Sequence, residues 1–243
     1  MASSEKAHES KIYKSIIKMK DNQKDGVMFV NKPKGITSHD VVDIVRRRIN
    51  IRKVGHAGTL DPLAEGLLII LVGKYTKAFS QFVGFDKKYS GIMKLGEVTS
   101  TGDSQGELIE TKECSRLTEL EIKEAFSFFE GDIDQIPPMV SALKVKGKRL
   151  YSLARRGIVV KRDSRRIRVH SLKIIKIDMP YVELYVHCSK GTYVRKLAED
   201  IGQRLGCGAH MVKILRLGIG PFTLDKACDL DSINESHLQK ITI

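Results

Sequence analysis

The pattern of hydrophobic and polar positions along the chain predicts a mixture of strands and helices. Short apolar runs at 27–30 and 67–72 predict buried strands, the second from its length and its isoleucine and valine content. Alternating positions at 89–95 predict another strand, and the segments 167–177 and 181–188 predict a strand pair. Strands and helices do not alternate regularly, so the pattern favours an α+β fold over a doubly wound parallel sheet.

Three segments carry the signals of helices. Ser38 is placed to cap a helix that reaches about residue 49, with valines along one face. The segment 118–129 begins with a T-x-x-E capping box and is followed by Gly131. A third helix is predicted from Gly191-Thr192 to about residue 205, where Gly206 stops it.

The chain of 243 residues shows no internal repeat and no Pro- or Ser-rich linker. We therefore expect one continuous domain over residues 26–243. Residues 1–25 lack the apolar stretch of a signal peptide, and their acidic residues argue against a transit peptide. They are predicted to form a polar, flexible tail.

Composition narrows the class of protein. The longest strongly apolar run, residues 66–73, is far too short to span a bilayer. Four cysteines without CxxC spacing suit reduced thiols, which indicates a cytoplasmic location. Cys207 and His210 form a C-x-x-H, but without a second matching pair ordinary packing is favoured over zinc. We expect neither a metal site nor a cofactor site.

The net charge of +13 is concentrated in one segment. Residues 144–173 contain 12 basic residues and one acidic residue, and so carry +11 of that charge. Such a segment could be a solvated hairpin, but like charges at this density repel unless a polyanion neutralises them. Gly147, Gly157 and the β-branched residues 158–160 break the amphipathic helix that a membrane patch needs. We therefore expect the arginines of this segment to contact RNA phosphates, in particular Arg162, Arg165 and Arg166.

The segment 55–66, GHAGTLDPLAEG, is the most unusual in the chain. Asp61 precedes Pro62, and proline disfavours the helical conformation of its predecessor, so Asp61 is predicted to be extended. A carboxylate on a Gly-rich loop anchored by a buried strand suits nucleophilic or acid/base work. The alternative is a simple Asp-Pro turn without chemistry. Phosphate-binding loops and Ser nucleophile elbows have no matching spacing.

GHAGTLDPLAEGLL resembles the catalytic motif of the TruB family of pseudouridine synthases, and five flanking segments follow in that family's order. They are GVMFVNKPKGITS (26–38), KKYSGIMKLG (87–96), GDIDQIPPMVSALKVKGKRLYSLARRG (131–157), CSKGTYVRKLAEDIG (188–202) and GCGAH (206–210). The resemblance covers about residues 26–220 and implies a mixed, largely antiparallel sheet flanked by helices. The chain ends soon after the last motif, as in a short form without the small C-terminal RNA-binding domain of bacterial relatives.

The resemblance implies roles for individual residues. Asp61 matches the catalytic aspartate, His56 a histidine beside the flipped-out nucleotides, and Tyr89 the tyrosine that packs on the target base. Arg195 matches the ion-pair partner of the aspartate. Asn31, Val140 and Ile214 depart from the residues frequent at their positions. The implied substrate-binding residues are His56, Tyr89, Tyr193, Arg195, Ile214 and Lys32.

Three of these positions also have plainer interpretations. Tyr89 could be a half-buried strand tyrosine, and His56 could brace its loop. Arg195 could pair with Glu199 at i+4 on a helix surface, which contributes about 0.3–0.5 kcal/mol. The resemblance favours instead an arginine that points into the site and keeps Asp61 ionised.

The resemblance further implies a function. Family members convert a uridine in the T-loop of tRNA, position 55, to pseudouridine without a cofactor. The carboxylate could attack ribose or uracil, or remove a proton from ribose. The expected partner is the T-arm of tRNA, with no membrane, no guide RNA and no obligate protein partner. Alternatives are a noncatalytic RNA-binding or tRNA-folding protein, a guide-RNA-dependent rRNA modifier, and another uridine-acting enzyme on the same scaffold.

Overall fold

The computed structural model describes residues 25–241 apart from 142 and 146. The chain divides into two compact units. Unit 1 contains the described residues up to Phe85 and those from Pro221 onward, and unit 2 runs from Asp86 to Gly220. Almost all of the predicted polar tail, residues 1–25, lies outside the described residues. The segment 26–243, predicted as one domain, thus contains two compact units.

Unit 1 is built on the two buried strands that the apolar runs predict. Strand β1 (Gly26–Lys32) pairs antiparallel with β3 (Glu65–Val72). Strand β2 (Val54–Ala57) pairs with the end of β3, and the short β14 (Cys228–Asp229) lies parallel to β1. The predicted strands are confirmed, and each extends a few residues beyond its apolar run.

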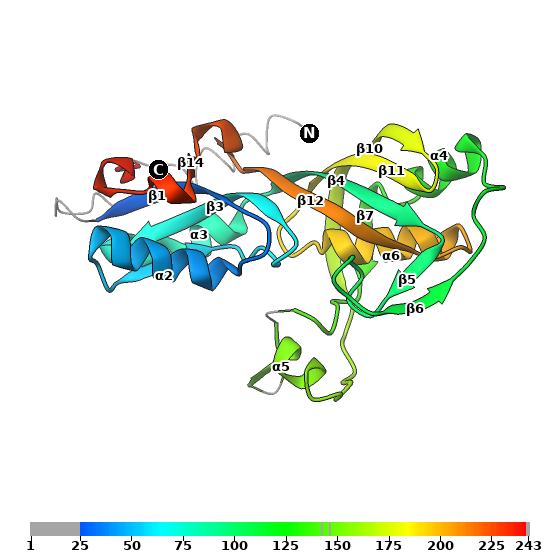
Figure 1. Ribbon diagram of the computed structural model, residues 1–243, viewed down its shortest axis with the longest axis horizontal. Coiled ribbons are helices and arrows are strands. Elements are labelled where there is room, and N and C mark those ends of the chain that lie inside the picture. The colour runs from blue at the N-terminus through cyan, green and yellow to red at the C-terminus, as the bar shows by residue number, and fades with distance from the viewer. Residues whose placement is uncertain (1–24, 142, 146, 242–243) are drawn as a thin grey trace. The chain divides into compact units, whose positions relative to one another are not determined.

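Helix α2 (Ser38–Ile49) lies against these strands, as Figure 1 shows. Its valines and Ile49 form one hydrophobic core with residues from β1, β2 and β3. The predicted cap is wrong by one residue, because Thr37 rather than Ser38 is the N-cap. The Thr37 side chain accepts from the Asp40 backbone N–H at 3.1 Å, and the Asp40 carboxylate accepts from the Thr37 N–H at 2.7 Å.

Unit 1 also contains a cluster of four phenylalanines that joins its two chain segments. These are Phe29, Phe82, Phe85 and Phe222. The shorter elements of unit 1 are η1 (Gly73–Ala78), α3 (Phe79–Gly84), β13 (Phe222–Thr223), η2 (Leu224–Lys226), η3 (Leu230–Ser232) and η4 (Glu235–His237).

Unit 2 contains an antiparallel sheet in which β4 (Lys87–Leu95) lies between β12 (Ala209–Ile219) and β11 (Tyr181–Cys188). Beyond β11 follow β10 (Arg165–Asp178) and β7 (Gly131–Gln135), in the order β12-β4-β11-β10-β7. The predicted pairing of the strands at 167–177 and 181–188 is therefore confirmed. A separate hairpin is formed by β5 (Glu97–Thr99) and β6 (Leu108–Thr111).

Two helices flank this sheet, so the predicted α+β fold with a mixed, largely antiparallel sheet is confirmed. Helix α4 (Glu119–Ser127) has the predicted capping box between Thr118 and Glu121. Helix α6 (Val194–Arg204) packs on β12 through its apolar face. It begins two residues later than predicted, with Tyr193 as its N-cap. Among the described residues, no helix is both long and apolar enough to cross a membrane.

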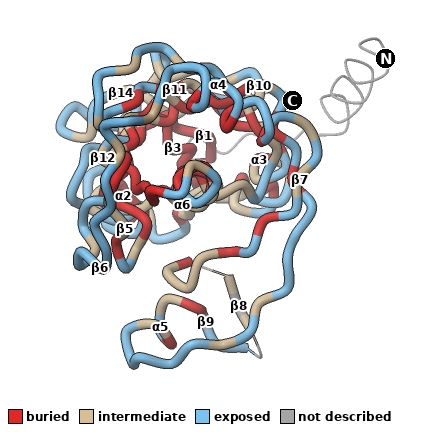
Figure 2. The backbone as a smooth tube through the Cα atoms, turned by 90° about the vertical axis from the view of Figure 1, so that its right-hand side faces the viewer, coloured by how far each residue is buried: buried red, intermediate tan, exposed pale blue. Residues whose placement is uncertain are grey.

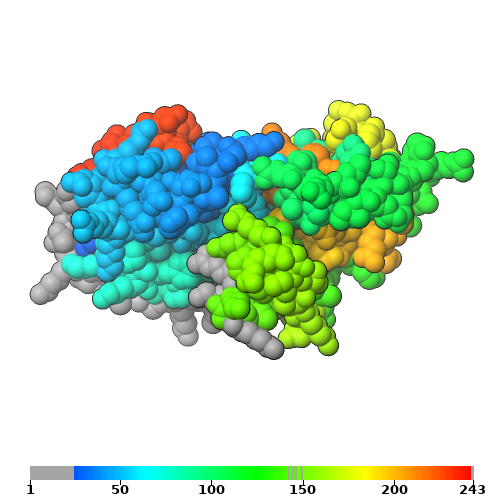
Figure 3. All heavy atoms as spheres, turned by 60° about the horizontal axis from the view of Figure 1, so that its bottom comes forward, coloured from blue at the N-terminus to red at the C-terminus, as the bar shows by residue number. Residues whose placement is uncertain are grey.

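The basic segment 144–173 contains a small hairpin and a short helix before it enters β10. These elements are β8 (Lys144–Val145), β9 (Lys148–Arg149) and α5 (Leu150–Ala154). Figures 1 and 2 show α5 and its neighbours set apart from the sheet of unit 2, and Figure 2 shows that most residues between α5 and β10 are exposed. The space-filling view shows the same segment as a yellow-green protrusion (Figure 3).

Candidate active site

Asp61 lies in the loop between β2 and β3, outside any helix or strand. The side chain is half-buried. The loop is closed on itself by the Ala64 N–H, which donates to the Asp61 carbonyl at 3.0 Å. The Pro62 carbonyl accepts from the Gly35 N–H at 2.8 Å, which ties the loop to the turn after β1. Asp61 is therefore presented on a backbone that is held on both sides.

Ser38 fixes the residue that precedes Asp61. The buried Ser38 hydroxyl accepts from the Leu60 backbone N–H at 2.8 Å and donates to the Leu60 carbonyl at 3.1 Å. Both polar groups of Leu60 are thus satisfied by one side chain of α2. The serine expected to cap the helix instead positions the Asp61 loop.

Lys32 is completely buried at the end of β1. Its ammonium donates to the carbonyls of Pro33 and Ile36 at 2.8 and 2.7 Å. These bonds close the turn after β1, and Gly35 of this turn contacts the Asp61 loop. Gly35 has φ of +95°, a conformation that favours glycine. Unit 1 therefore brings the Lys32 turn and the Asp61 loop together, while substrate binding by Lys32 stays a prediction.

His56 lies on β2, opposite Ile70 of β3, and is half-buried. Only Ala57 separates it from the loop that carries Asp61, and this loop begins at Gly58 with φ of +93°. Its predicted place beside a flipped-out nucleotide stays a prediction.

Tyr89 and Ile214 lie on neighbouring strands of unit 2 and on one face of the sheet. Tyr89 of β4 pairs with Arg216 of β12, and Ile214 pairs with Gly91. Side chains two apart share a face of a strand, so Tyr89, Ile214 and Arg216 are grouped together. All three are buried, and Arg216 is one of the largest fully buried side chains. The sheet thus brings two predicted site residues to one place and adds a buried arginine.

Tyr193, the N-cap of α6, is held through its backbone. The Tyr193 N–H donates to the Gln135 side-chain oxygen at 2.8 Å, and the Gln135 amide donates to the Tyr193 carbonyl at 3.1 Å. Gln135 is the last residue of β7 and is buried. This two-bond clamp fixes the start of α6, two residues before Arg195.

Arg195 is buried, with 3% of its side chain exposed. Its Nη1 lies 3.4 Å from the Asp103 carboxylate and donates to the Thr101 carbonyl at 2.6 Å, while Nη2 donates to the Val140 carbonyl at 2.9 Å. The guanidinium therefore uses its planar fork to bind three acceptors.

The alternative of a surface pair between Arg195 and Glu199 is wrong. Arg195 is not on the surface, and Glu199 lies 3.3 Å from the ammonium of Lys196. Burial raises the pKa of Glu199 in spite of that neighbour. A direct contact between Arg195 and Asp61 stays a prediction.

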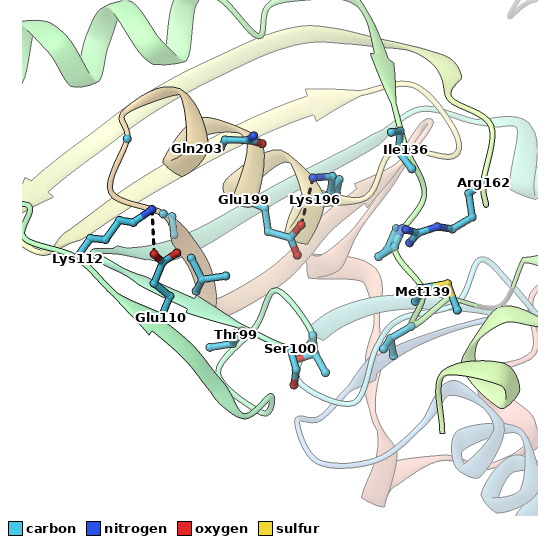
Figure 4. A pocket seen from close by; sticks show the side chains of 17 residues that line it. Thr99, Ser100, Glu110, Lys112, Ile136, Met139, Arg162, Lys196, Glu199 and Gln203 are labelled. Atoms are coloured by element: carbon cyan, nitrogen blue, oxygen red, sulfur yellow. Dashed lines mark ion pairs between the residues drawn. The ribbon is translucent and has the colours of Figure 1, made fainter. Parts of the chain in front are cut away.

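A cleft of about 670 Å³ opens beside the carbonyl partners of Arg195 in unit 2 (Figure 4). Thr101 and Val140 line it, together with residues of β5, β6 and α6. Two ion pairs lie along its wall, Lys112 with Glu110 at 3.2 Å and Lys196 with Glu199 at 3.3 Å. The volume is within the range of small-molecule and nucleotide sites.

The three arginines predicted to contact phosphates have different surroundings. Arg165 and Arg166 are exposed at the start of β10, and Arg166 lies 3.4 Å from Asp134. Arg162 is half-buried and lines the cleft, where its Nη1 donates to the Pro137 carbonyl at 3.0 Å. Its buried Nε has no hydrogen-bond partner among the described residues. Arg162 is therefore placed to contact a ligand in the cleft, whereas Arg165 and Arg166 face solvent.

None of the four cysteines has the lowered pKa of a nucleophilic thiol. Burial raises the pKa of Cys114, Cys207 and Cys228, and raises that of Cys188 to about 12. Cys207 is buried and its thiol donates to the Gly208 carbonyl at 3.3 Å, which is ordinary packing.

Lys87 is a buried cation on β4, and its ionisation gives a test of the structure. Burial and the nearby Arg216 lower the pKa of its ammonium to about 8. An unfolded lysine keeps a pKa of about 10.4. Between these values the unfolded chain holds a proton that the folded chain has lost, so the contribution of Lys87 to stability rises with pH.

We expect Lys87→Met to remove this rise. From pH 7.5 to 10.5, the free energy of unfolding of the variant should fall relative to the wild type by up to about 3 kcal/mol. Urea denaturation at intervals across this range measures the difference. Lys88→Met, at the exposed neighbouring position, is the control and should show no such trend. Parallel curves for wild type and Lys87→Met would contradict the buried, weakened ammonium.

Four residues of this arrangement were not predicted from the sequence: Ser38 as a brace, Asp103, Gln135 and Arg216. Asp103 also accepts from the Thr101 hydroxyl at 2.6 Å and the Gln105 N–H at 3.1 Å, so it organises its own loop. The polar loop TSTGDSQG, residues 99–106, gave a turn signal that could have drawn attention to it. Gln135 and Arg216 are polar residues within strands that contain other polar residues, and no pattern distinguishes them.

Comparison with known proteins gives matches along most of the chain. Residues 46–194 match the family model described as TruB family pseudouridylate synthase (N terminal domain). Residues 195–241 match tRNA pseudouridylate synthase B C-terminal domain. The second match begins at Arg195 and includes α6 and β12 of unit 2. The predicted lack of a further C-terminal RNA-binding domain stays a prediction.

Curated relatives and solved structures agree with these matches. A protein of Clostridium tetani named tRNA pseudouridine synthase B is 44% identical over 90% of this chain and 76% of its own length. One of the same name from Opitutus terrae is 46% identical over 89% of this chain and 90% of its own length. A structure titled as a Cbf5-Nop10-Gar1 complex superposes with a TM-score of 0.68 and 29% identity, covering 88% of this chain and 60% of that one.

These matches extend across the Asp61 loop, the Tyr89 strand and the Arg195 helix. The level of identity to the named relatives applies over nine tenths of the chain. The chain therefore belongs to the TruB family of pseudouridylate synthases.

Proposed function

We propose that this protein isomerises a uridine in the T-loop of tRNA, at position 55, to pseudouridine. Its relatives of 44–46% identity are named tRNA pseudouridine synthase B. The observation that carries the proposal is the carboxylate of Asp61, half-buried on a loop that Ser38 and Gly35 hold at both ends. A fixed carboxylate can act on ribose or uracil without the cost of ordering a mobile loop.

The proposed reaction changes the connection of one base and adds no atoms. The bond from C1′ of ribose to N1 of uracil breaks, the uracil turns, and a bond from C1′ to C5 forms. The proton that leaves C5 is balanced by the proton that N1 gains. Asp61 is the group proposed to act at the sugar or base during the cleavage, and Arg195 is proposed as its ion-pair partner.

The target base must leave its stack before it can react. Flipping costs a few kcal/mol, and stacking on an aromatic side chain returns about 1–3 kcal/mol per base. Tyr89 is proposed as the platform for the uracil, because its face of the sheet also carries Ile214 as an apolar wall. His56 is proposed to lie beside the flipped nucleotides.

The proposed partner is the T-arm of tRNA alone. The excess charge of segment 144–173 supports binding of a polyanion. The titles of similar structures name an H/ACA RNP and a Cbf5-Nop10-Gar1 complex, and this chain spans 51% and 60% of those chains. Those assemblies raise the alternative of modification directed by a guide RNA, and a test of the function must include it. A cytoplasmic location and the lack of an obligate protein partner stay predictions.

The decisive experiment uses the purified protein and an unmodified tRNA transcript without any other RNA or protein. Chemical mapping of pseudouridine should find one modified position in the T-loop, and a transcript with U→C at that position should remain unmodified. Binding of the transcript without any modification would support a noncatalytic RNA-binding protein. Modification only after addition of a guide RNA would support the guide-dependent alternative.

Arg165 and Arg166 should supply part of the electrostatic contribution to tRNA affinity. Each phosphate contact releases counterions, so it steepens the dependence of log affinity on log salt by about 0.7–0.9. We expect the double variant Arg165→Gln/Arg166→Gln to bind tRNA more weakly and to lower this slope by about 1–2. Turnover at saturating tRNA and the position of modification should not change, because phosphate contacts carry little sequence information.

Filter binding at a series of salt concentrations measures the slope. Lys123→Gln/Lys176→Gln removes the same charge from two exposed lysines that pair with Glu119 and Asp178, and it serves as the control. Equal slopes for both double variants would place the RNA away from the start of β10.

A further inference from the structure

Three side chains that bind metals in other proteins meet at one place in unit 2. Asp86 precedes β4, His170 lies on β10 and His187 lies on β11. Their ligand atoms all lie within 4.8 Å of one another. His170 Nε2 is 2.9 Å from a carboxylate oxygen of Asp86, and the two imidazole rings are 4.6 Å apart between centroids.

A β-bulge places His170 in this group. Val169 pairs with Cys188 and Ser171 with His187, so His170 is an extra residue between two consecutive pairs. An extra residue of this kind bends the strand and redirects its side chain. His170 belongs to the same outer series as Arg166 and Arg168 on β10, and its ring stacks beside that of His187.

The backbones of His187 and Asp86 are held by hydrogen bonds within the unit. His187 pairs with Ser171 on one side and with Lys88 of β4 on the other. The Asp86 carbonyl accepts from the Gly220 N–H at 2.8 Å, directly before β4 begins. Ligands on fixed backbones need little ordering when an ion binds, which favours affinity.

We propose that Asp86, His170 and His187 form a binding site for a divalent transition-metal ion, for which Zn²⁺ is the best match. Imidazole nitrogen with carboxylate oxygen is a donor set that zinc prefers, whereas Mg²⁺ and Ca²⁺ prefer oxygen alone. Bonds of about 2.0–2.1 Å in a tetrahedral site put neighbouring ligand atoms about 3.4 Å apart. The three ligand atoms lie within 4.8 Å of one another, so the side chains must move closer together to reach that spacing, and a fourth position is left for water.

A simple ion pair between His170 and Asp86 explains two of the three side chains and leaves the stacked ring of His187 without a role. A bound metal ion would involve all three side chains, and it would link the start of β4 to β10 and β11. Lys88 is exposed opposite His187, and its charge lowers the affinity for a cation while Asp86 raises it.

The site is on the face of the sheet opposite to Tyr89. Side chains of a strand alternate between faces, and Tyr89 follows Lys88 on β4 just as Val186 precedes His187 on β11. Tyr89 and Val186 are buried, whereas Lys88 and His187 belong to the outer face. The proposal therefore stands or fails independently of the proposed isomerase activity.

The test is a calorimetric titration of the full-length protein with Zn²⁺ after dialysis against a chelator. We expect one saturable site in the wild type. Loss of a group that only supports a ligand costs about 10–100-fold in metal affinity, so His170→Ala and His187→Ala should each weaken binding at least tenfold. His39→Ala removes another histidine that faces an aspartate, at 3.8 Å, and Cys114→Ser removes a partly exposed thiol. Both controls should bind Zn²⁺ as the wild type does.

Circular dichroism of each variant shows whether it is folded. His170 is exposed on a bulge, so His170→Ala remains informative even if His187→Ala does not fold. No saturable Zn²⁺ binding by the wild type would overturn the proposal. A dissociation constant within twofold of the wild type in folded His170→Ala would overturn it as well, and a loss in Cys114→Ser alone would assign the ion to a thiol.

Discussion

Asp61→Asn protein should form no measurable pseudouridine in tRNA while it binds tRNA within a few-fold of the wild type. The substitution keeps the size of the side chain and removes its charge and its basicity. Loss of a group that acts covalently or as the base lowers turnover by about 10⁴-fold or more. Binding should persist, because neutralising a carboxylate relieves repulsion from phosphates and leaves the loop contacts of Leu60 and Pro62 in place.

Single-turnover assays with enzyme in excess over tRNA measure the chemical step, and filter binding measures affinity separately. Asp43→Asn, which neutralises an exposed aspartate on α2 of the same unit, is the matched control and should retain activity. Measurable turnover by purified Asp61→Asn would mean that another group performs the chemistry. Loss of both binding and melting cooperativity would mean that Asp61 maintains the loop.

The strands of this protein could be predicted because local patterns determine them. The run at 67–72 is buried throughout β3, and the alternation at 89–95 continues through β4. The local pattern does not indicate the order of the strands within the sheet. Strand β4 lies between β11 and β12, which are about 90 and 120 residues further along the chain, and no local signal specifies such long-range pairing.

Helix ends show how competing hydrogen bonds decide a local choice. Thr37 and Ser38 are both good caps, so the type of the capping residue alone does not rank them. The structure uses Thr37 because Asp40 lies three residues later and completes a capping box. Ser38 is then available for Leu60, a partner 22 residues away that only the folded loop brings near.

The candidate site could be predicted in part for the same reason. Asp61 stands in a contiguous motif, and its extended loop follows from Pro62. Asp103 and Gln135 act through bonds to residues 92 and 58 positions later, so their roles appear only once the sheet of unit 2 is assembled. The same holds for the group of Asp86, His170 and His187, which no spacing motif connects.

Arg195→Lys should lose most of the activity although it keeps the positive charge. The guanidinium holds Asp103, the Thr101 carbonyl and the Val140 carbonyl at once, and an ammonium is a point charge that cannot reproduce this planar arrangement. Thr101 and Val140 line the cleft, so the arginine also fixes the position of that wall. We expect a loss in turnover of at least about 100-fold, the usual size when a positioning contact is displaced by 1 Å.

Arg195→Ala should lose stability as well as activity. Asp103 is 5% exposed, and removing its partner leaves a carboxylate buried without its counter-charge, which costs about 3–5 kcal/mol. The double variant Arg195→Ala/Asp103→Asn should recover part of that stability but none of the activity. Urea denaturation and single-turnover rates, measured well below the melting temperature, separate the two effects.

Arg204→Lys provides the control for an arginine on the same helix, because Arg204 is exposed and stacks on Phe128. It should leave turnover unchanged, since its contact lies at the far end of α6 from Arg195. If Arg195→Lys turned over tRNA at a near-normal rate, the fork of three bonds would have no part in catalysis and a charge at this position would suffice. If Arg195→Ala were as stable as the wild type, the buried pair with Asp103 would be absent in solution. We expect folded Arg195→Lys protein to bind tRNA normally and to turn it over slowly. This result would show that Arg195 positions groups at the reacting nucleotide.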